Sequence, residues 1–412
     1  MTDHLKSAIK RLAQEHPLFH PQEMLVKVQE SKKRLAIGLP KEIAYQENRI
    51  VLRPESVRVL VANGHEIYVE SGAGLPSRYS DNDYSEAGAQ IVYSPEEVFK
   101  TDIVLKIDMP TLAEIEMMSH RATLISSLPL AKVTQEYLHA INRKKITAIA
   151  YEMIEDEVGG LPLVRAMSEI AGSTVMLIAA ELLSNTSGGK GIILGGITGV
   201  PPTKVLILGA GTVAEYAARA ALGLGASVKI FDDNLYKLRR LKHSLGDRQI
   251  YTSTIEATTL ARALRTTNVA IGALRHQDGR SICVVTEEMV SQMRPDSVII
   301  DVSIDNGGCF ETSRLTFHDA PTYRRYGVIH YCVPNIASRV ARTATKAISN
   351  IFTPLLRRMG ELGGVEEMIY NDHGFAKGVY SYSGELTNEY IGRKFHMKHK
   401  ELSLIIAAAI RQ

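Results

Sequence analysis

A glycine-rich turn in the second half of the chain is the clearest candidate for a ligand site. An apolar, strand-like segment, Lys204 to Leu208, runs directly into Gly209-Ala-Gly211-Thr-Val-Ala214, and the helix-forming stretch EYAARAALGLGA follows. In such a turn the first glycine permits a tight reversal, the second lets the backbone approach a pyrophosphate, and the alanine keeps the helix close to the strand. The start of the helix then offers free N–H groups and a positive dipole end to phosphate.

An acidic residue closes the next predicted strand. Asp232 ends SVKIFD, 23 residues after Gly209. Its carboxylate would accept hydrogen bonds from the adenine ribose hydroxyls and repel a 2′-phosphate, so the turn and the acid together predict a dinucleotide site that prefers NAD to NADP. Two alternatives stay open: Asp232 is a solvated residue in a strand-end turn, or Asp233 shares or takes the role.

The elements around this turn predict a complete dinucleotide-binding fold. Six strand-like segments follow one another, separated by helices or loops: KVLILGAG, SVKIFDDN, QIYTST, NVAIGAL, SVIIDVS and IHYCVPN. Six is the number of strands in such a fold. The first half begins as β-α-β with RLAIGLPKE and HEIYVESGAG, and continues with AGAQIVYS, DIVLKID and ATLISSL. Strands that alternate with helices are typical of a parallel sheet covered by helices.

We therefore expect an α/β protein with two Rossmann-like domains and parallel sheets. The substrate domain is predicted to be discontinuous, residues 34–165 and 338–412, and to flank an NAD-binding domain at 166–337, entered by a long small-residue helix from Pro162 to about Leu183. Residues 1–33 are predicted to form a helical extension, because Leu5, Ile9 and Leu12 recur at helical spacing.

Composition narrows the function classes. The 412 residues carry a formal charge of only +3, which gives no reason to expect a nucleic-acid partner. The three cysteines have neither CxxC spacing nor a neighbouring pair of histidines, so we expect no disulfide framework and no metal site. The first residues lack the apolar run of a signal peptide, and we find no stretch of about 18 apolar residues that would span a membrane. A cytoplasmic protein with a small-molecule ligand is expected.

Several longer segments resemble the alanine dehydrogenase family and, more distantly, the nucleotide-binding domain of proton-translocating transhydrogenase. The resemblance covers roughly residues 34 to 390. It is carried by IGLPKEI, ENRIVLRPESVRVLVANGHEIYVESGAG, LPLVRAMSEIAG, GGITGVPPTKVLILGAGTVAEYAARAALGLGASVKIFDDN and SVIIDVSIDNGGCFETSR. The segments IDNGGCFETSR and YCVPN favour the dehydrogenase branch.

The resemblance implies two domains that flank a cleft, with the nicotinamide at its floor. It implies the conversion of L-alanine, NAD and water into pyruvate, ammonia and NADH by a homo-oligomer, a hexamer. Arg49 matches the arginine that grips the substrate carboxylate, and Asp305 matches an aspartate beside the nicotinamide ribose and substrate. The positions assigned to the cofactor are Ser168, Gly209, Gly211, Thr212, Val213, Asp232, Lys237, Ala273, Leu274 and Asn335. Alternatively, Arg49 forms a surface ion pair with Glu47 or Glu42, and Asp305 caps a turn.

Two positions depart from the family pattern. The family's catalytic lysine lies in a strand resembling LKVKEP, but its counterpart here is Asp108 in LKIDMP. The catalytic histidine lies in a segment ending FLHLA, but its counterpart here is Pro129 in SLPLA. Because side chains two apart on a strand share a face, we expect Lys106 and Asp108 to point into one pocket. They form either a pair that recognises an amino acid, or a purely structural arrangement; His276 is a conceivable substitute acid–base group.

Three functions remain. The first is an NAD-dependent amino-acid dehydrogenase, acting on alanine or a related substrate, with Arg49, Lys106, Asp108 and Asp305 at its catalytic centre. The second is a catalytically reduced NAD-binding sensor or scaffold, which Asp108 and Pro129 favour. The third is a transhydrogenase-like subunit that exchanges hydride with a membrane partner. The cofactor turn and Arg49 favour the first.

Overall fold

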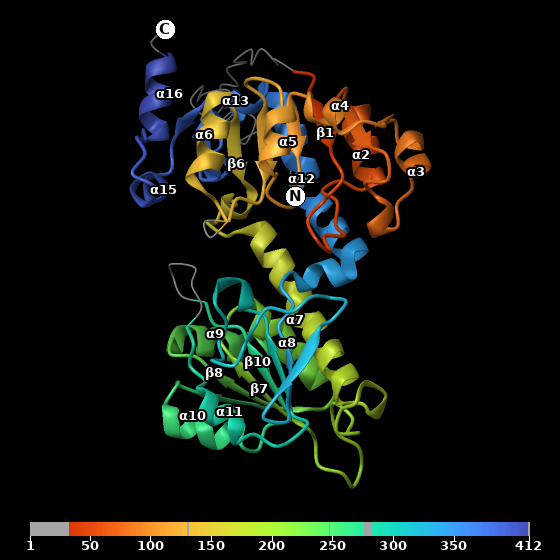
Figure 1. Ribbon diagram of the computed structural model, residues 1–412, viewed down its shortest axis with the longest axis vertical. Coiled ribbons are helices and arrows are strands. Elements are labelled where there is room, and N and C mark those ends of the chain that lie inside the picture. Colours follow the sequence, from red (N-terminus) through yellow and green to blue (C-terminus); the bar gives the residue numbers. More distant parts are fainter. Residues whose placement is uncertain (1–32, 130–131, 247, 276–281, 411–412) are drawn as a thin grey trace, which may run out of the picture.

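The computed structural model describes residues 33–129, 132–246, 248–275 and 282–410. The helix expected within residues 1–33 and the candidate His276 lie outside the described residues. Two sheets with their own helices stand at opposite ends of the molecule (Figure 1), and two long helices connect them. Both sheets are mostly parallel and carry helices, as the sequence predicts for two Rossmann-like domains.

The first sheet has eight strands in the order β15-β14-β6-β5-β4-β1-β2-β3. The strands are β1 (Ala36–Leu39), β2 (Glu66–Glu70), β3 (Gln90–Val92), β4 (Ile103–Leu105), β5 (Thr123–Ser126), β6 (Thr147–Ala150), β14 (Val379–Tyr382) and β15 (Glu385–Leu386). The first six pair in parallel, whereas β14 is antiparallel to β6. The chain thus returns to this sheet after it has formed the second one. We propose that the domain limits are those predicted from the sequence, with a discontinuous first domain.

The second sheet has seven strands in the order β12-β13-β11-β10-β7-β8-β9. They are β7 (Lys204–Leu208), β8 (Ser227–Phe231), β9 (Ile250–Ser253), β10 (Val269–Gly272), β11 (Val298–Asp301), β12 (Thr322–Arg325) and β13 (Val328–Tyr331). The six predicted strands are all present. The seventh, β12, is an antiparallel edge strand that the sequence analysis missed, because its residues TYRR are mostly exposed and carry no apolar alternation.

Helices cover the faces of both sheets. Those of the first region are α2 (Pro54–Ala62), α3 (Asp81–Glu86), α4 (Pro95–Phe99), α5 (Leu112–Met117), α6 (Gln135–Arg143), α13 (Val365–Asn371), α14 (His373–Ala376), α15 (Glu389–Lys394) and α16 (Leu402–Ile410). Those of the second are α8 (Thr212–Gly223), α9 (Leu235–Ser244), α10 (Ala257–Leu264) and α11 (Glu287–Ser291). The connecting helices are α7 (Pro162–Leu183) and α12 (Ala341–Leu362).

Helix α7 packs closely along α8, and Gly172 allows this approach. A Cβ atom at Gly172 would lie 2.4 Å from the carbonyl oxygen of Val213. By length and apolar composition α7 could cross a membrane, which the sequence analysis did not anticipate, but half of its most apolar stretch is buried inside the protein. A helix of this length and composition is equally typical of the buried core of a protein, where it can join two domains.

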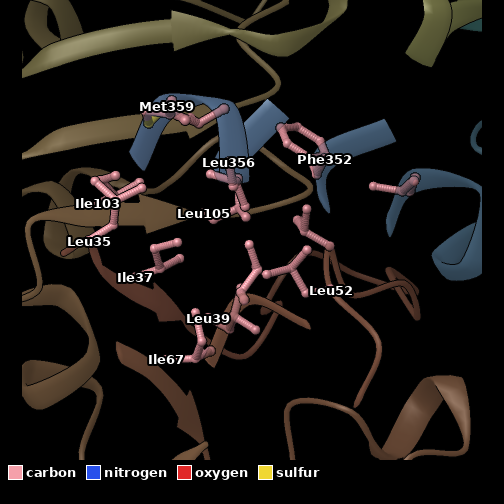
Figure 2. Packing of buried hydrophobic residues seen from close by; sticks show 14 of the residues in the cluster. Leu35, Ile37, Leu39, Leu52, Ile67, Ile103, Leu105, Phe352, Leu356 and Met359 are labelled. Atoms are coloured by element: carbon pink, nitrogen blue, oxygen red, sulfur yellow. The ribbon is translucent and has the colours of Figure 1, made fainter. Parts of the chain in front are cut away.

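Helix α12 completes the core of the first region. Its side chains Phe352, Leu356 and Met359 pack against apolar side chains of β1 and β4, which include Ile37 and Leu105 (Figure 2). All five are at most 1% exposed. Burial of each such side chain contributes about 1.5–3 kcal/mol to the stability of the fold. Helix α12, which follows the second sheet in the chain, is therefore an integral part of the core around the first sheet.

Candidate active site

Both sheets have a topological switch point, where the strand order reverses. In the first sheet this point lies between β1 and β4, and in the second between β7 and β10. Ligands of open parallel sheets bind beside the carboxyl ends of the strands at such points. We call the carboxyl ends of β1, β4, β5 and β6 the substrate edge, and those of β7, β8 and β10 the cofactor edge.

The cofactor edge is shaped by its backbone. Gly209 follows β7 with a φ of +107°, a conformation that favours glycine, and its N–H donates to the carbonyl of Phe231 at 2.7 Å. A Cβ atom at Gly209 would lie 2.5 Å from the carbonyl oxygen of Ala273, so the turn after β7 is packed directly against the residue after β10. Gly209 is therefore required by the protein itself.

Gly211 has a different environment. It is the N-cap residue of helix α8, and a Cβ atom at this position would meet no atom of the described residues within 4 Å, its two chain neighbours apart. Thr212 and Val213, in the first turn of α8, are partly exposed. The described part of the chain therefore gives no steric reason for a glycine at position 211, whereas a pyrophosphate that approaches the backbone at the helix N-terminus would give one. These residues fit a dinucleotide.

Asp232 is buried at the end of β8, with 6% of its surface exposed. Its Oδ2 accepts the N–H of Ala210 at 2.7 Å, and its Oδ1 accepts the N–H of Asn234 at 2.7 Å. The carboxylate thus holds the glycine turn against the start of α9 and is not a solvated turn residue. Each carboxylate oxygen can accept a second hydrogen bond. Asp233 is exposed and accepts the N–H of Ile255 at 3.0 Å.

The other predicted cofactor residues lie on four separate elements or loops. Ser168 is half-buried on α7, and Lys237 is exposed in the first turn of α9, which Asn234 caps. Leu274 is buried beyond β10, where its carbonyl accepts the hydroxyl of Ser303 at 2.9 Å. Asn335 adopts a left-handed conformation in the segment that leads back to the first region.

Arg49 lies at the substrate edge in an ion pair with Glu47. Its Nε and Nη2 donate to the two carboxylate oxygens of Glu47 at 2.7 and 2.6 Å. The side chains are only 11% and 4% exposed, so this is not the surface ion pair considered as an alternative. Among the described residues, Nη1 contacts only the sulfur of Met167, at 3.3 Å, which is a weak acceptor. This leaves donors on Nη1 for a carboxylate.

Electrostatics keep this pair charged. Burial alone would lower the pKa of Arg49, but attraction to Glu47 outweighs it and raises that pKa. Burial alone would raise the pKa of Glu47, but Arg49 and the hydrogen bonds to Glu47 lower it. The amide of Asn335 also donates to Glu47 Oε2, at 2.5 Å. Because Asn335 follows β13, this hydrogen bond joins the substrate edge to the second sheet.

Helix α12 and the turn before it hold the segment that presents Arg49. Ser338 Oγ accepts the N–H of Asn48 at 2.9 Å and donates to the carbonyl of Gln46 at 2.7 Å. Thr345 Oγ1 accepts the N–H of Ile50 at 3.1 Å. The backbone on either side of Arg49 is thus fixed by residues almost 300 positions later, so its guanidinium is positioned by the whole fold.

Asp305 lies in a short 3-10 helix, Ile304–Asn306, after β11. The buried carboxylate of Asp301 organises this loop, because it accepts the N–H of Cys309 and the hydroxyl of Ser313, both at 2.7 Å. Asp305 keeps contact with solvent, yet the surrounding protein desolvates its carboxyl and raises its pKa. Lys132, the N–H of Asn335 and Arg49 act in the opposite direction. Asp305 is therefore within electrostatic reach of the substrate edge.

Of the two alternatives for Lys106, a pair with Asp108 or a structural role, the structure favours the second. Strand β4 ends at Leu105, so the alternation of side chains along a strand does not extend to Asp108. Lys106 is 1% exposed, and its Nζ lies 2.9 Å from Glu114 Oε1 and 3.3 Å from Glu42 Oε2. Asp108 instead pairs with Lys132, at 3.3 Å. Two carboxylates sequester Lys106, which gives it a structural role here.

Glu42 connects β1 to the loop after β4. Its oxygens accept the N–H groups of Ile107, at 2.5 Å, and Asp108, at 3.3 Å. Burial raises the pKa of Glu42 to about 7, although Lys106 and these N–H groups act to lower it. Near neutral pH this carboxyl group therefore carries a proton part of the time.

The segment that contains Pro129 is held by the end of β6. Glu152 Oε1 accepts the N–H of Leu128 at 2.9 Å, whereas Oε2 is buried without a hydrogen-bond partner in the described structure. Burial raises the pKa of the Glu152 carboxyl. Beside it, the hydroxyl of Tyr151 donates to the carbonyl of Ile107 at 2.6 Å. Hydrogen bonds with the two residues that follow β6 thus hold the turns after β4 and β5 in place.

Sequence reasoning missed Asp301, Glu152 and Lys132, and it named Glu47 and Glu42 only as neighbours of Arg49. A carboxylate at the last position of a buried strand was a usable signal for Asp301. No local signal identifies the others, because their partners lie on separate loops. Two surface hollows of about 670 and 600 Å³ lie elsewhere, against α5 and α6 and near α16. Charge and backbone geometry, not cavity volume, therefore define the candidate site.

Comparisons with known proteins identify the family of the chain. Residues 38–171 match the model of the alanine dehydrogenase/PNT N-terminal domain, and residues 175–389 match that of the C-terminal domain. An alanine dehydrogenase of Methanococcus maripaludis is 39% identical over 361 residues, 87% of this chain and 96% of the relative. One of Staphylococcus epidermidis is 38% identical over 369 residues, 89% and 99% of the two chains.

Solved structures give the same relationship. An L-alanine dehydrogenase superposes with a TM-score of 0.82 at 38% identity and covers 88% of this chain and 99% of its own. A transhydrogenase from Sinorhizobium meliloti superposes with a TM-score of 0.73 at 23% identity, over 86% and 99% of the two chains. At that identity the second likeness concerns the fold alone.

Proposed function

The chain belongs to the alanine dehydrogenase/PNT family, and on that premise we propose that it is an NAD-dependent amino-acid dehydrogenase. The reaction converts L-alanine, or a closely related amino acid, with NAD and water into the 2-oxo acid, ammonia and NADH. The observation that carries this proposal is the hydrogen bond between Asn335 and Glu47, because Glu47 also holds Arg49. It supports one site built from both edges.

Each edge would have its own task. NAD supplies the acceptor for the hydride that leaves the amino acid. Gly211, the first turn of α8 and Asp232 would bind its pyrophosphate and adenine ribose. Arg49 would hold the substrate carboxylate through Nη1 while Glu47 fixes the plane of the guanidinium. Asp305, which is within electrostatic reach of Arg49, would lie beside the nicotinamide ribose and the reacting carbon.

The test is an assay of the purified full chain with NAD and a panel of amino acids, followed by NADH absorbance. The proposal expects turnover that is highest with alanine or a close relative. A second candidate, an NAD-binding protein without this turnover, is favoured by Asp108 and Pro129, which replace the family's lysine and histidine. Tight NAD binding without turnover on any amino or hydroxy acid would select that second candidate.

We further propose that the protein is a cytoplasmic homo-oligomer, a hexamer by resemblance. Large apolar side chains are exposed on the loop after α7, where Ile193, Ile197 and Val200 are 63%, 60% and 54% exposed. Exposed apolar groups favour burial between subunits. Light scattering at micromolar concentration should give a multiple of the chain mass of 45.4 kDa, and a monomer would refute the proposal.

A further inference from the structure

Three cationic side chains of the substrate edge differ in how many carboxylates hold them. Arg49 is paired with Glu47 but retains donors on Nη1. Lys106 is enclosed by Glu42 and Glu114 and is 1% exposed. Lys132 is 63% exposed and has a single carboxylate partner, Asp108. Of the two lysines, Lys132 is therefore the one whose ammonium group can meet a ligand without first being released from the interior.

The position of Lys132 is defined on both sides. Its backbone N–H donates to the carbonyl of Pro129 at 2.9 Å, which places it in the turn that follows β5. Its Nζ reaches the loop after β4, 3.3 Å from Asp108 Oδ1. Its charge also lowers the pKa of Asp305 more than any other group does. The ammonium group thus acts on Asp305 of the second region while it contacts Asp108 of the first.

The proposed substrate needs two separate donors. A 2-oxo acid carries a carboxylate and a C2 oxygen, and negative charge develops on that oxygen when ammonia adds to the carbon. The guanidinium of Arg49, whose Nε and Nη2 are held by Glu47, offers the donors of Nη1 to the carboxylate. The C2 oxygen suits a single ammonium group. Lys132 has three N–H donors, and a hydrogen bond to Asp108 occupies only one of them.

We propose that Lys132 donates a hydrogen bond to the C2 oxygen of a 2-oxo acid, and that Asp108 is the positioning residue that holds it there. This inference rests on the proposed function. It gives Asp108 a purpose: the aspartate does not contact the substrate but directs a cation from the neighbouring loop toward it. The competing interpretation is an ordinary exposed ion pair, which contributes little to stability and nothing to catalysis.

The chain contains a matched control. Lys400 and Glu385 form an ion pair at 3.1 Å, and Lys400 is 60% exposed, almost the same as Lys132. In the amination direction, with NADH, ammonium and pyruvate, Lys132→Ala should lower kcat/KM for pyruvate about 100-fold, the effect of losing one donor to a developing oxyanion. Lys132→Arg should retain part of the activity. Lys400→Ala should leave kcat/KM unchanged, and NADH affinity should stay within about twofold in all three.

Exchanging the charges at positions 108 and 132 tests whether the location of the ammonium group matters, and not only the residue that carries it. Asp108→Lys combined with Lys132→Asp returns an ammonium group to the site from the opposite loop, so it should be at least tenfold more active than Lys132→Ala. If the exchange variant is no better than Lys132→Ala, Asp108 is not the positioning residue. If Lys132→Ala has the same kcat/KM as wild type, the inference is wrong although the proposed function stands.

Binding distinguishes a failure of the inference from a failure of the proposed function. If the wild-type protein shows no turnover, pyruvate binding to its NADH complex can be followed by NADH fluorescence. Binding that Lys132→Ala weakens at least tenfold supports the role of Lys132, and equal binding overturns it. If the wild-type NADH complex neither reacts nor binds pyruvate, both the proposed function and the inference fall.

Discussion

The two carboxyl edges are built by different physical means. The cofactor edge uses backbone shape: a glycine with φ of +107°, a second glycine beside open space, and a buried aspartate that ties two turns together. The substrate edge uses charge, because Glu47 with Arg49, and Glu42 and Glu114 with Lys106, are largely buried ion pairs. A large, rigid cofactor can thus be bound mainly by steric fit, whereas a small charged substrate needs ionic side chains whose positions are fixed by oppositely charged partners.

The largest expected effect concerns the charge-built edge. Arg49→Lys keeps the charge but loses the two-pronged contact with Glu47, and it should lower kcat/KM for the amino acid at least 100-fold, since disrupting a buried, hydrogen-bonded ion pair costs about 2–5 kcal/mol. Steady-state kinetics measure the change in kcat/KM, and a binding assay should show that the affinity for NADH is the same as in wild type. Arg357→Lys, in an exposed pair with Glu361, is the control. If the Arg49→Lys protein has full activity, Arg49 does not bind the substrate.

The next effect concerns the shape-built edge. Gly211→Ala should weaken NADH binding at least tenfold, because the new methyl group enters the space assigned to the pyrophosphate. The melting temperature should stay unchanged, because among the described residues only the chain neighbours of Gly211 have atoms within 4 Å of that methyl group. Gly223→Ala, later in the same helix and equally uncrowded, should leave NADH binding as it is. Equal NADH affinity in both variants would show that phosphate does not approach Gly211.

A smaller effect tests the choice between cofactors. Asp232→Asn removes the charge that would repel a 2′-phosphate but retains one oxygen acceptor, so it should narrow the preference for NAD over NADP about tenfold in calorimetry, which corresponds to 1.4 kcal/mol. Asp233→Asn is the neighbouring control, and it should change nothing. If only Asp233→Asn narrows the preference, the role belongs to Asp233, and comparable wild-type affinities for both cofactors would leave no preference to explain.

The last effect is on stability rather than on binding or activity, and it is a pH dependence that arises at the substrate edge. Glu42 has its folded-state pKa raised from 4.5 to about 7, so its contribution to stability is full below about pH 4.5 and is lost as the pH rises through 7. Between pH 5 and 8 the stability of wild type should therefore fall relative to Glu42→Gln by on the order of 1–3 kcal/mol. Urea unfolding at both pH values measures this difference. A constant difference between the two proteins would mean that Glu42 does not titrate in that range.

The same contrast explains how far the sequence could be interpreted. The turn from Gly209 to Ala214 and Asp232 lie within one β-α-β unit, so spacing and residue type predicted their arrangement. The burial of Asp232 and its two backbone partners were not predictable, because they depend on how the turns close over it. The long helix Pro162–Leu183 was predicted with its correct limits.

The substrate edge was much less predictable. The pairing of Asp108 with Lys132, and of Lys106 with Glu42 and Glu114, depends on loops that only the folded sheet brings together. The position of Arg49 depends on Ser338 and Thr345, which are almost 300 residues away in the sequence. Of the two alternatives left open for Lys106, the pair with Asp108 was wrong, because it extended the alternation of a strand beyond Leu105, where β4 ends.

The most direct test of the central claim, that the two edges form one dehydrogenase site, is the initial rate of NADH oxidation by the purified full chain with pyruvate and ammonium. The claim predicts oxidation that requires both substrates together, at a rate on the order of 1–1000 per second per chain. NADH that binds tightly but is not oxidised above the rate without protein, with pyruvate or any related 2-oxo acid, would contradict it.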